Sequence, residues 1–371
     1  MDLKRLAQRF TAITASILPM FALADTPLGW INNGNMSAYT TTKGELELAA
    51  SYQAVNGTID FLNVREDLFA SNRRLVGKSG DLQGARLEAH YGITDFLSVF
   101  ARHQEHELTV DLGEISSINV LDIDDSLDTT QQEIGFRWML YEADLLNPSN
   151  ERTALSLQVT GFQNETDNFD VVTDQITFSN VIVRFLEPTA FSVSDLEDAG
   201  WTSRLLFTRS LGSLGVGTVW AGYGESSSTS GTSTTALNGT IRNLFSQEFT
   251  LEEEYFYLGA SLNFRVNARM PVTINYEFID INKSQFSRNP ETPSSQLPGF
   301  LSSSGPAAER SNHTLNARIS YWVTPALNLS FSGNLFSNQF LGRLPHYNNP
   351  LSESFATAPY GFIGAELGYR F

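Results

Sequence analysis

Hydrophobic and polar residues alternate with a period of two along most of this chain after residue 43. In the stretch Val272–Asp280, for example, Val272, Ile274, Tyr276 and Phe278 alternate with polar residues. Because successive side chains of a β-strand point to opposite faces, such segments are predicted to be strands with one apolar and one polar face. Twelve segments fit this pattern: Glu45–Tyr52, Gln83–Tyr91, Phe96–Leu108, Gln132–Tyr141, Thr153–Phe162, Trp201–Thr208, Gly215–Tyr223, Phe256–Val266, Val272–Asp280, Thr314–Val323, Asn328–Phe336 and Gly361–Phe371.

Short and long connections between these segments alternate strictly. The short ones contain turn residues and lie at 92–95, 145–152, 211–213, 267–271 and 324–326. The long ones are polar and lie at 54–81, 111–130, 164–200, 224–250, 282–311 and 338–359. Serine- and proline-rich stretches within them, such as 226–240 and 289–306, are typical of irregular surface loops. Antiparallel strands sorted in this way place all short turns at one end of a barrel and all long loops at the other.

The N-terminus has the three-part layout of a secretory signal peptide. Lys4, Arg5 and Arg9 precede a mostly apolar run from residue 10 to 23, and Ala24 completes a small-residue cleavage pattern. The alternative, an anchoring helix, needs about 20 apolar residues, and the run is shorter. We therefore expect a signal peptide at 1–24, a short N-terminal periplasmic segment at 25–42 and the barrel at 43–371.

Composition narrows the class of protein further. The chain of 371 residues has no cysteine, so an exported domain of this kind is not held together by disulfides. Its formal net charge is −17, and nucleic acid is therefore not an expected partner.

The last strand ends on an aromatic residue without a polar tail. Ile363, Ala365, Leu367, Tyr369 and Phe371 form its apolar face. With the leader, the alternation and the sorted loops, this end resembles bacterial outer-membrane β-barrel proteins of the porin-like kind. The resemblance implies an all-β antiparallel transmembrane barrel of about 12 strands, with short periplasmic turns and long extracellular loops, in the outer membrane of a Gram-negative bacterium. Fourteen strands is the alternative if the loop at 164–200 or 54–81 contains a further hairpin.

The resemblance also implies partners. The outer-membrane assembly machinery would read the final strand through Tyr369 and Phe371, and the outer surface would contact lipid and lipopolysaccharide. Aromatic residues near strand ends are candidates for the interfacial girdles, namely Tyr52, Tyr91, Tyr141, Trp201, Tyr223, Trp322 and Phe371.

Charged residues on the polar face of the strands are predicted to point into the lumen, which is the interior of the barrel. They are Glu45, Glu47, Arg86, Glu88, Glu133, Arg137, Arg204, Glu277, Arg318, Glu366 and Arg370. One hypothesis is a water-filled pore in which these groups select solutes. The other is a closed network of ion pairs that fills a barrel of intermediate width.

Two further features could carry chemistry. The loop at 111–128 contains Asp122, Asp124, Asp125 and Asp128 without a basic residue, so these are weak candidates for divalent cation ligands. His103 and His106 are three residues apart, which on a strand places them on opposite faces. No arrangement typical of an enzyme is found, and no cofactor is expected.

The sequence thus favours an outer-membrane channel for passive diffusion of small polar solutes or ions. A plugged barrel with a structural or surface-binding role is the alternative, and a transporter of apolar compounds is less favoured because the predicted inner face is polar.

Overall fold

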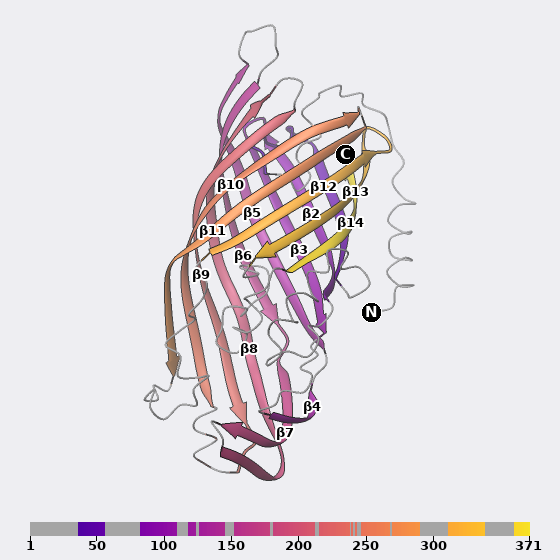
Figure 1. Cartoon of the computed structure of the whole chain (residues 1–371). Coiled ribbons are helices and arrows are strands. Elements are labelled where there is room, and N and C mark those ends of the chain that lie inside the picture. The colour runs from indigo at the N-terminus through magenta and orange to yellow at the C-terminus, as the bar shows by residue number, and fades with distance from the viewer. Residues whose placement is uncertain are drawn as a thin grey trace.

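The computed structural model is built almost entirely of β-strands (Figure 1). It describes residues 36–55, 82–109, 118–123, 126–144, 152–178, 181–211, 215–237, 246–267, 269–289, 311–337 and 360–371, and the single residues 239 and 242. No helix in these ranges is long and apolar enough to cross a membrane.

The described residues form fourteen strands. They are β1 (Leu46–Val55), β2 (Leu82–Thr94), β3 (Leu97–Thr109), β4 (Ile118–Ile123), β5 (Ser126–Asp144), β6 (Arg152–Thr166), β7 (Phe169–Phe178), β8 (Val181–Ser210), β9 (Val216–Thr234), β10 (Gln247–Asn267), β11 (Met270–Asn289), β12 (Ser311–Trp322), β13 (Leu327–Ser337) and β14 (Tyr360–Arg370).

Twelve of these strands close into an antiparallel barrel. The strand order is β8-β6-β5-β3-β2-β1-β14-β13-β12-β11-β10-β9, and β8 pairs with β9 to complete the circle. The first strand pairs with the last over eight residue pairs, from Glu47↔Arg370 to Ala54↔Ile363. The prediction of a twelve-stranded antiparallel barrel is confirmed.

The alternative of fourteen strands is resolved by the position of β4 and β7. A hairpin does lie within residues 164–200, because β7 pairs with the first part of β8. However, β7 is followed in the sheet by β4 alone, so both strands extend the sheet beyond the closed circle. Figure 1 shows them at the lower end of the molecule.

The outer surface of the barrel is apolar. Along β2, Leu87 is 56% exposed whereas the next residue, Glu88, is 4% exposed. The same alternation leaves large apolar side chains exposed around the barrel, including Ile134, Phe207, Leu258, Ile319 and Phe331. A soluble protein buries such residues, and here the polar ones are buried instead. The barrel is therefore a transmembrane barrel of the outer-membrane type, with a lipid-facing outer surface.

Most of the predicted girdle aromatics lie on this outer surface, but Trp322 does not. Its side chain is 4% exposed and points inward, while the adjacent Tyr321 is 45% exposed and points outward. Two consecutive aromatic residues at a strand end can each satisfy the pattern, and the prediction chose the wrong one. At the other end of the barrel, the rings of Trp201 and Tyr223 lie 5.8 Å apart on the outward face.

Several strands continue beyond the lipid-facing surface, which corrects the predicted loop boundaries. Residues 224–250 were expected to form a loop, but β9 continues to Thr234 and β10 begins at Gln247. β8 has 30 residues, whereas about 9 to 11 suffice to cross a membrane. The continuation of β9 after Tyr223 consists mostly of serine and threonine, and a strand with water on its outer side has no apolar alternation by which to recognise it.

Candidate functional site

The inner face of the barrel is polar, and the structure places the predicted lumenal charges on it. Cross-strand pairing fixes this arrangement, because Glu88 pairs with Arg102, and Arg102 with Glu133, on the same face. The inward residues from the prediction are Glu47, Arg86, Glu88, Glu133, Arg137, Arg204, Glu277, Arg318, Glu366 and Arg370, and Glu45 directly precedes β1 on the same side.

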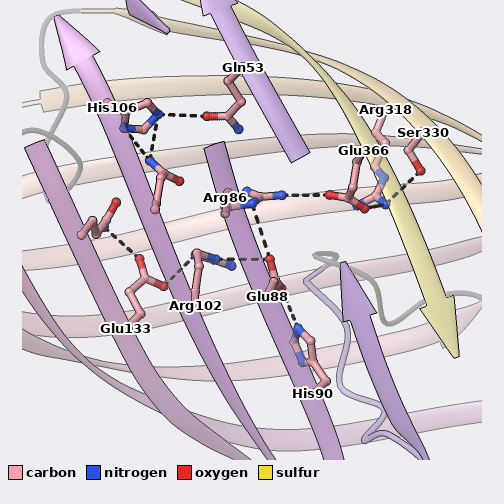
Figure 2. A network of polar contacts seen from close by, with 12 residues as sticks. Gln53, Arg86, Glu88, His90, Arg102, His106, Glu133, Arg318, Ser330 and Glu366 are labelled. Atoms are coloured by element: carbon pink, nitrogen blue, oxygen red, sulfur yellow. Dashed lines mark hydrogen bonds and ion pairs between the residues drawn. The ribbon is translucent and has the colours of Figure 1, made fainter. Parts of the chain in front are cut away.

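Six charged side chains of alternating sign form a belt along part of this inner face (Figure 2). We call it the charged belt, and its members are Glu133, Arg102, Glu88, Arg86, Glu366 and Arg318. On one side Arg102 Nη1 lies 2.6 Å from Glu133 Oε2, and Arg102 Nε lies 3.3 Å from Glu88 Oε2. Arg86 Nε continues the chain at 3.7 Å from Glu88 Oε2.

The other half of the charged belt crosses the pairing of the first strand, β1, with the last strand, β14. Arg86 Nη2 on β2 donates to Glu366 Oε2 on β14 over 3.0 Å. Arg318 on β12 donates to the second carboxylate oxygen of Glu366 and also to Ser330 Oγ, the latter over 3.0 Å. Each arginine therefore contacts a carboxylate on another strand, and the belt cross-links β12, β14, β2, β3 and β5.

The charged belt is only partly closed to water. The Glu88 and Glu366 side chains are 2% and 8% exposed, whereas those of Arg102 and Glu133 are 25% and 16% exposed. The wall of the barrel covers the outer side of these inward groups. Their exposed surface therefore opens towards the lumen.

Sequence reasoning missed two members of this network, Arg102 and His90. Arg102 lies on the polar side of the predicted strand at 96–108, so the alternation alone would have identified it. His90 Nε2 lies 2.6 Å from Glu88 Oε1, and its ring stacks on Phe100 at a centroid distance of 5.6 Å. The alternation places His90 inward but cannot show which carboxylate it contacts.

A second group of charges lies elsewhere around the lumen, on β8 to β11. Arg204 Nη2 lies 3.3 Å from Glu277 Oε2, and Trp220 Nε1 donates to the same oxygen over 2.9 Å. Arg204 also lies over the ring of Tyr257, 4.6 Å from its centroid. A glycine makes room for the indole, since a Cβ on Gly259 would lie 2.2 Å from Trp220 Cε2.

A third group of charges lies at the periplasmic end of the barrel, where β1 begins and β14 ends. Arg370 lies 2.7 Å from a carboxylate oxygen of Glu45 and 2.6 Å from one of Glu47. Its guanidinium carbon is 5.7 Å from the centroid of the Trp322 ring, which is the contact that the inward position of this tryptophan makes possible.

Arg137 differs from the other arginines in its partners. Its Nε and Nη2 donate to Gln158 Oε1 over 3.1 and 2.8 Å, and its Nη1 donates to the carbonyl oxygen of Tyr39 over 3.0 Å. Within the described ranges no carboxylate forms an ion pair with it. This buried cation is therefore held by a side-chain amide and by the backbone of residues 36–42, which lie inside the barrel.

The predicted cation ligands are only partly within the described residues. Asp124 and Asp125 lie outside them, Asp122 belongs to β4, and Asp128 lies near the start of β5. Burial and, after it, the neighbouring carboxylates of Asp167 and Glu107 raise the pKa of Asp128 above its ordinary value. Among the residues that the structure describes, no three His, Cys, Asp or Glu side chains are grouped to hold a metal ion.

The two nearby histidines lie on opposite faces, as their spacing predicts. His106 is buried on the inner face, where Gln104 and Gln53 contact its ring. His103 points outward and lies 3.1 Å from Glu105.

Comparison with known proteins finds barrels of related shape. No protein-family model matches the chain, and no curated protein does. Among solved structures, the translocator domain of the autotransporter NalP from Neisseria meningitidis has 9% identity and a TM-score of 0.47, with 99% of this chain and 95% of that chain covered. An outer-membrane channel from Pseudomonas putida F1 has 8% identity and a TM-score of 0.43, covering 94% and 100%. The toluene transporter TodX from P. putida has 11% identity and a TM-score of 0.37, covering 88% of each chain.

Proposed function

We propose that this protein is an outer-membrane channel through which small polar solutes and ions diffuse passively. The observation that carries the proposal is the partial exposure of Arg102 and Glu133 on the inner face, because their exposed surface opens to the lumen. Fixed charges beside a water-filled path attract counter-ions and set the preference of the channel. The function requires no catalytic step and no cofactor.

The balance of charge favours cations over anions. The acids on the described inner face outnumber the arginines: Glu45, Glu47, Glu88, Glu133, Asp198, Glu253, Glu277 and Glu366 face Arg86, Arg102, Arg137, Arg204, Arg318 and Arg370. The excess of acids over arginines is small, and each arginine except Arg137 has a carboxylate partner. We therefore expect the preference for cations to be weak.

The surroundings of the channel follow from the same proposal. After removal of the leader at 1–24, the barrel inserts into the outer membrane of a Gram-negative bacterium, in contact with lipid and lipopolysaccharide. Tyr369 and Phe371 present the last strand to the assembly machinery. The acidic residues of the long loops contribute to the negative charge at the extracellular mouth.

Single-channel recording tests the proposal directly. The full chain without its leader is refolded, its folded state is checked by heat-modifiable migration on a detergent gel, and it is inserted into a planar bilayer. We expect reproducible conductance steps. Under a salt gradient, the sign of the reversal potential should show a preference for cations over anions. A folded protein that gives no steps at any voltage would contradict the proposal.

A plugged barrel with a structural or surface-binding role is the second candidate. Two observations favour it. The charges of the belt are paired with one another on the inner face, and residues 36–42 occupy the periplasmic end of the lumen. A plugged barrel of this kind predicts that the bilayer shows no conductance steps, even when residues 36–42 are released from the lumen. A transporter of apolar compounds has less support, because the buried apolar residues that pack together on the described inner face form two small groups. One is Tyr255, Tyr257, Ile279 and Ile281 on β10 and β11, and the other is Met139, Ala154, Leu206 and Trp220, which residues 36–42 cover.

A further inference from the structure

Residues 36–42 enter the lumen instead of running along the barrel rim. The amide nitrogen of Ala38 donates to Thr208 Oγ1 over 2.7 Å, and Ser156 Oγ donates to the carbonyl oxygen of Ala38. Arg137 donates to the next carbonyl oxygen, that of Tyr39. All three partners are inward-facing residues, so the backbone of the segment is held from inside the barrel.

The order of the strands shows that this segment reaches far around the inside of the barrel. It leads directly into β1, yet Thr208 belongs to β8, which is five strands from β1 in one direction and seven in the other. The near side is also fixed, because Gly92 accepts a hydrogen bond from Gly44 and Thr40 Oγ1 donates to the carbonyl oxygen of Asp95 in the turn between β2 and β3. The segment therefore lies inside the lumen along the wall, from the β2–β3 turn past Arg137 on β5 and Ser156 on β6 to Thr208 on β8.

The segment lies at the periplasmic mouth. Thr208 is near the last residue of β8, and Ala154, which packs against the segment, is near the first residue of β6. Both positions flank short turns, and short turns mark the periplasmic end.

The contacts of the segment are close but not part of the sheet. Ala38 and Tyr39 are buried against Met139, Ala154, Leu206 and Trp220. Gly92 gives the backbone space, since a Cβ there would lie 2.0 Å from the carbonyl oxygen of Thr42. Because residues 36–42 form no strand pairing, they can leave the lumen without opening the barrel wall.

We propose that residues 36–42 are a displaceable plug that closes the periplasmic mouth of the lumen and gates the channel. Departure of the plug removes the contact between Arg137 and Tyr39 and turns this arginine towards the open mouth. The inference rests on the proposed channel function, and the experiment below separates the two.

A pair of introduced cysteines tests the plug. Because the chain has no native cysteine, no other disulfide can form within it. Ala38→Cys with Thr208→Cys joins the plug to β8 when the protein is oxidised with diamide. The matched control, Thr208→Cys with Thr218→Cys, joins two inward residues of neighbouring strands whose hydroxyls are 2.9 Å apart and leaves the plug free. Both pairs are examined in the full mature chain, and cross-linking is read from gel mobility and mass.

The plug predicts that oxidation lowers the open probability of the first pair at least tenfold and that reduction restores it, while the control pair is unchanged. Tyr39→Ala, which removes the buried ring but leaves the wall intact, should raise the open probability without any cross-link. Equal conductance of the oxidised and reduced first pair, with the cross-link formed, would overturn the plug alone. Failure of the pair to cross-link in a folded barrel would also overturn it, because the segment would then not lie at Thr208. If no variant, oxidised or reduced, gives conductance steps although the cross-link has formed, both the channel function and the gate would be overturned.

Discussion

Arg86 on β2 and Glu366 on β14 form an ion pair across the seam where the last strand of the barrel meets the first. Their Nη2 and Oε2 atoms lie 3.0 Å apart, although the two residues are separated by 280 positions in the chain. The contact reaches over β1, whose backbone pairs with both strands. We expect a buried ion pair at this place to favour the correct pairing of the first and last strands when the barrel closes.

Glu366→Gln should destabilise the barrel by about 3 kcal/mol, since it removes the charge of the buried carboxylate that Arg86 and Arg318 share and leaves Arg86 only its longer contact with Glu88. Arg86→Met should cost less, because Arg318 still pairs with Glu366. Urea titration of the protein in vesicles measures both free energies of unfolding. As a control, Glu105→Gln removes an exposed outward partner of His103 and should cost less than about 1 kcal/mol. Equal losses for all three variants would contradict the role of the seam.

Arg102 and Glu133 should shift ion selectivity in opposite directions. Arg102→Met removes a lumen-exposed positive charge, so the reversal potential in a tenfold salt gradient should move towards the cation limit of about 59 mV. Glu133→Gln should move it the other way. The outward Glu105→Gln is again the control, because its charge lies outside the pore. Unchanged reversal potentials in both lumenal variants, with folding retained, would show that the solute path avoids the charged belt.

The barrel could be predicted from the sequence because lipid imposes a strict rule on its outer face. Leu87, Leu258 and Ile319 must be apolar and their neighbours in sequence need not be, so each membrane-crossing strand carries a period of two. Where the outer face meets water the rule ends. The polar continuation of β9 to Thr234 was therefore predicted as a loop, although its backbone pairs with β10 and β8.

The alternation identified the inner face but not its pairings. It placed Arg318 and Glu366 inward, yet their contact depends on the stagger of β12, β13 and β14, which the pattern does not record. Residues 36–42 carry no periodic signal at all. Their place in the lumen depends on the hydrogen-bonding side chains of Arg137 and Thr208, which are remote in sequence.

Leu258→Arg should destabilise the barrel by about 1–3 kcal/mol, because arginine on the lipid face costs about 2–4 kcal/mol at the membrane centre and less towards the interface, where Tyr223 pairs with the neighbouring Phe256. Leu258 is 52% exposed on β10, between the strands that carry Ala221 and Phe278. Leu186, which is 99% exposed on the part of β8 that pairs with β7 beyond the closed circle, is the matched control. Leu186→Arg should change the free energy of unfolding little, because that side chain is in water. A similar cost for the two variants would place β10 outside the membrane.

Phe371→Ser should lower the amount of protein in the outer membrane several-fold while leaving refolding in detergent nearly unchanged. The amide nitrogen of Phe371 donates to the carbonyl oxygen of Leu46 over 2.9 Å, and serine retains this backbone contact. Its ring is half exposed and packs edge-on against Tyr369 at a centroid distance of 4.6 Å, so little stability depends on it. We therefore expect the assembly machinery to bind this ring before the last strand pairs with the first. Phe331→Ser removes a lipid-facing aromatic that is 67% exposed on β13, away from the chain end, and serves as the control. Quantitative membrane fractionation compares the two variants in cells. If both fall by the same factor, the loss reflects lipid contact and not a signal carried by the last residue.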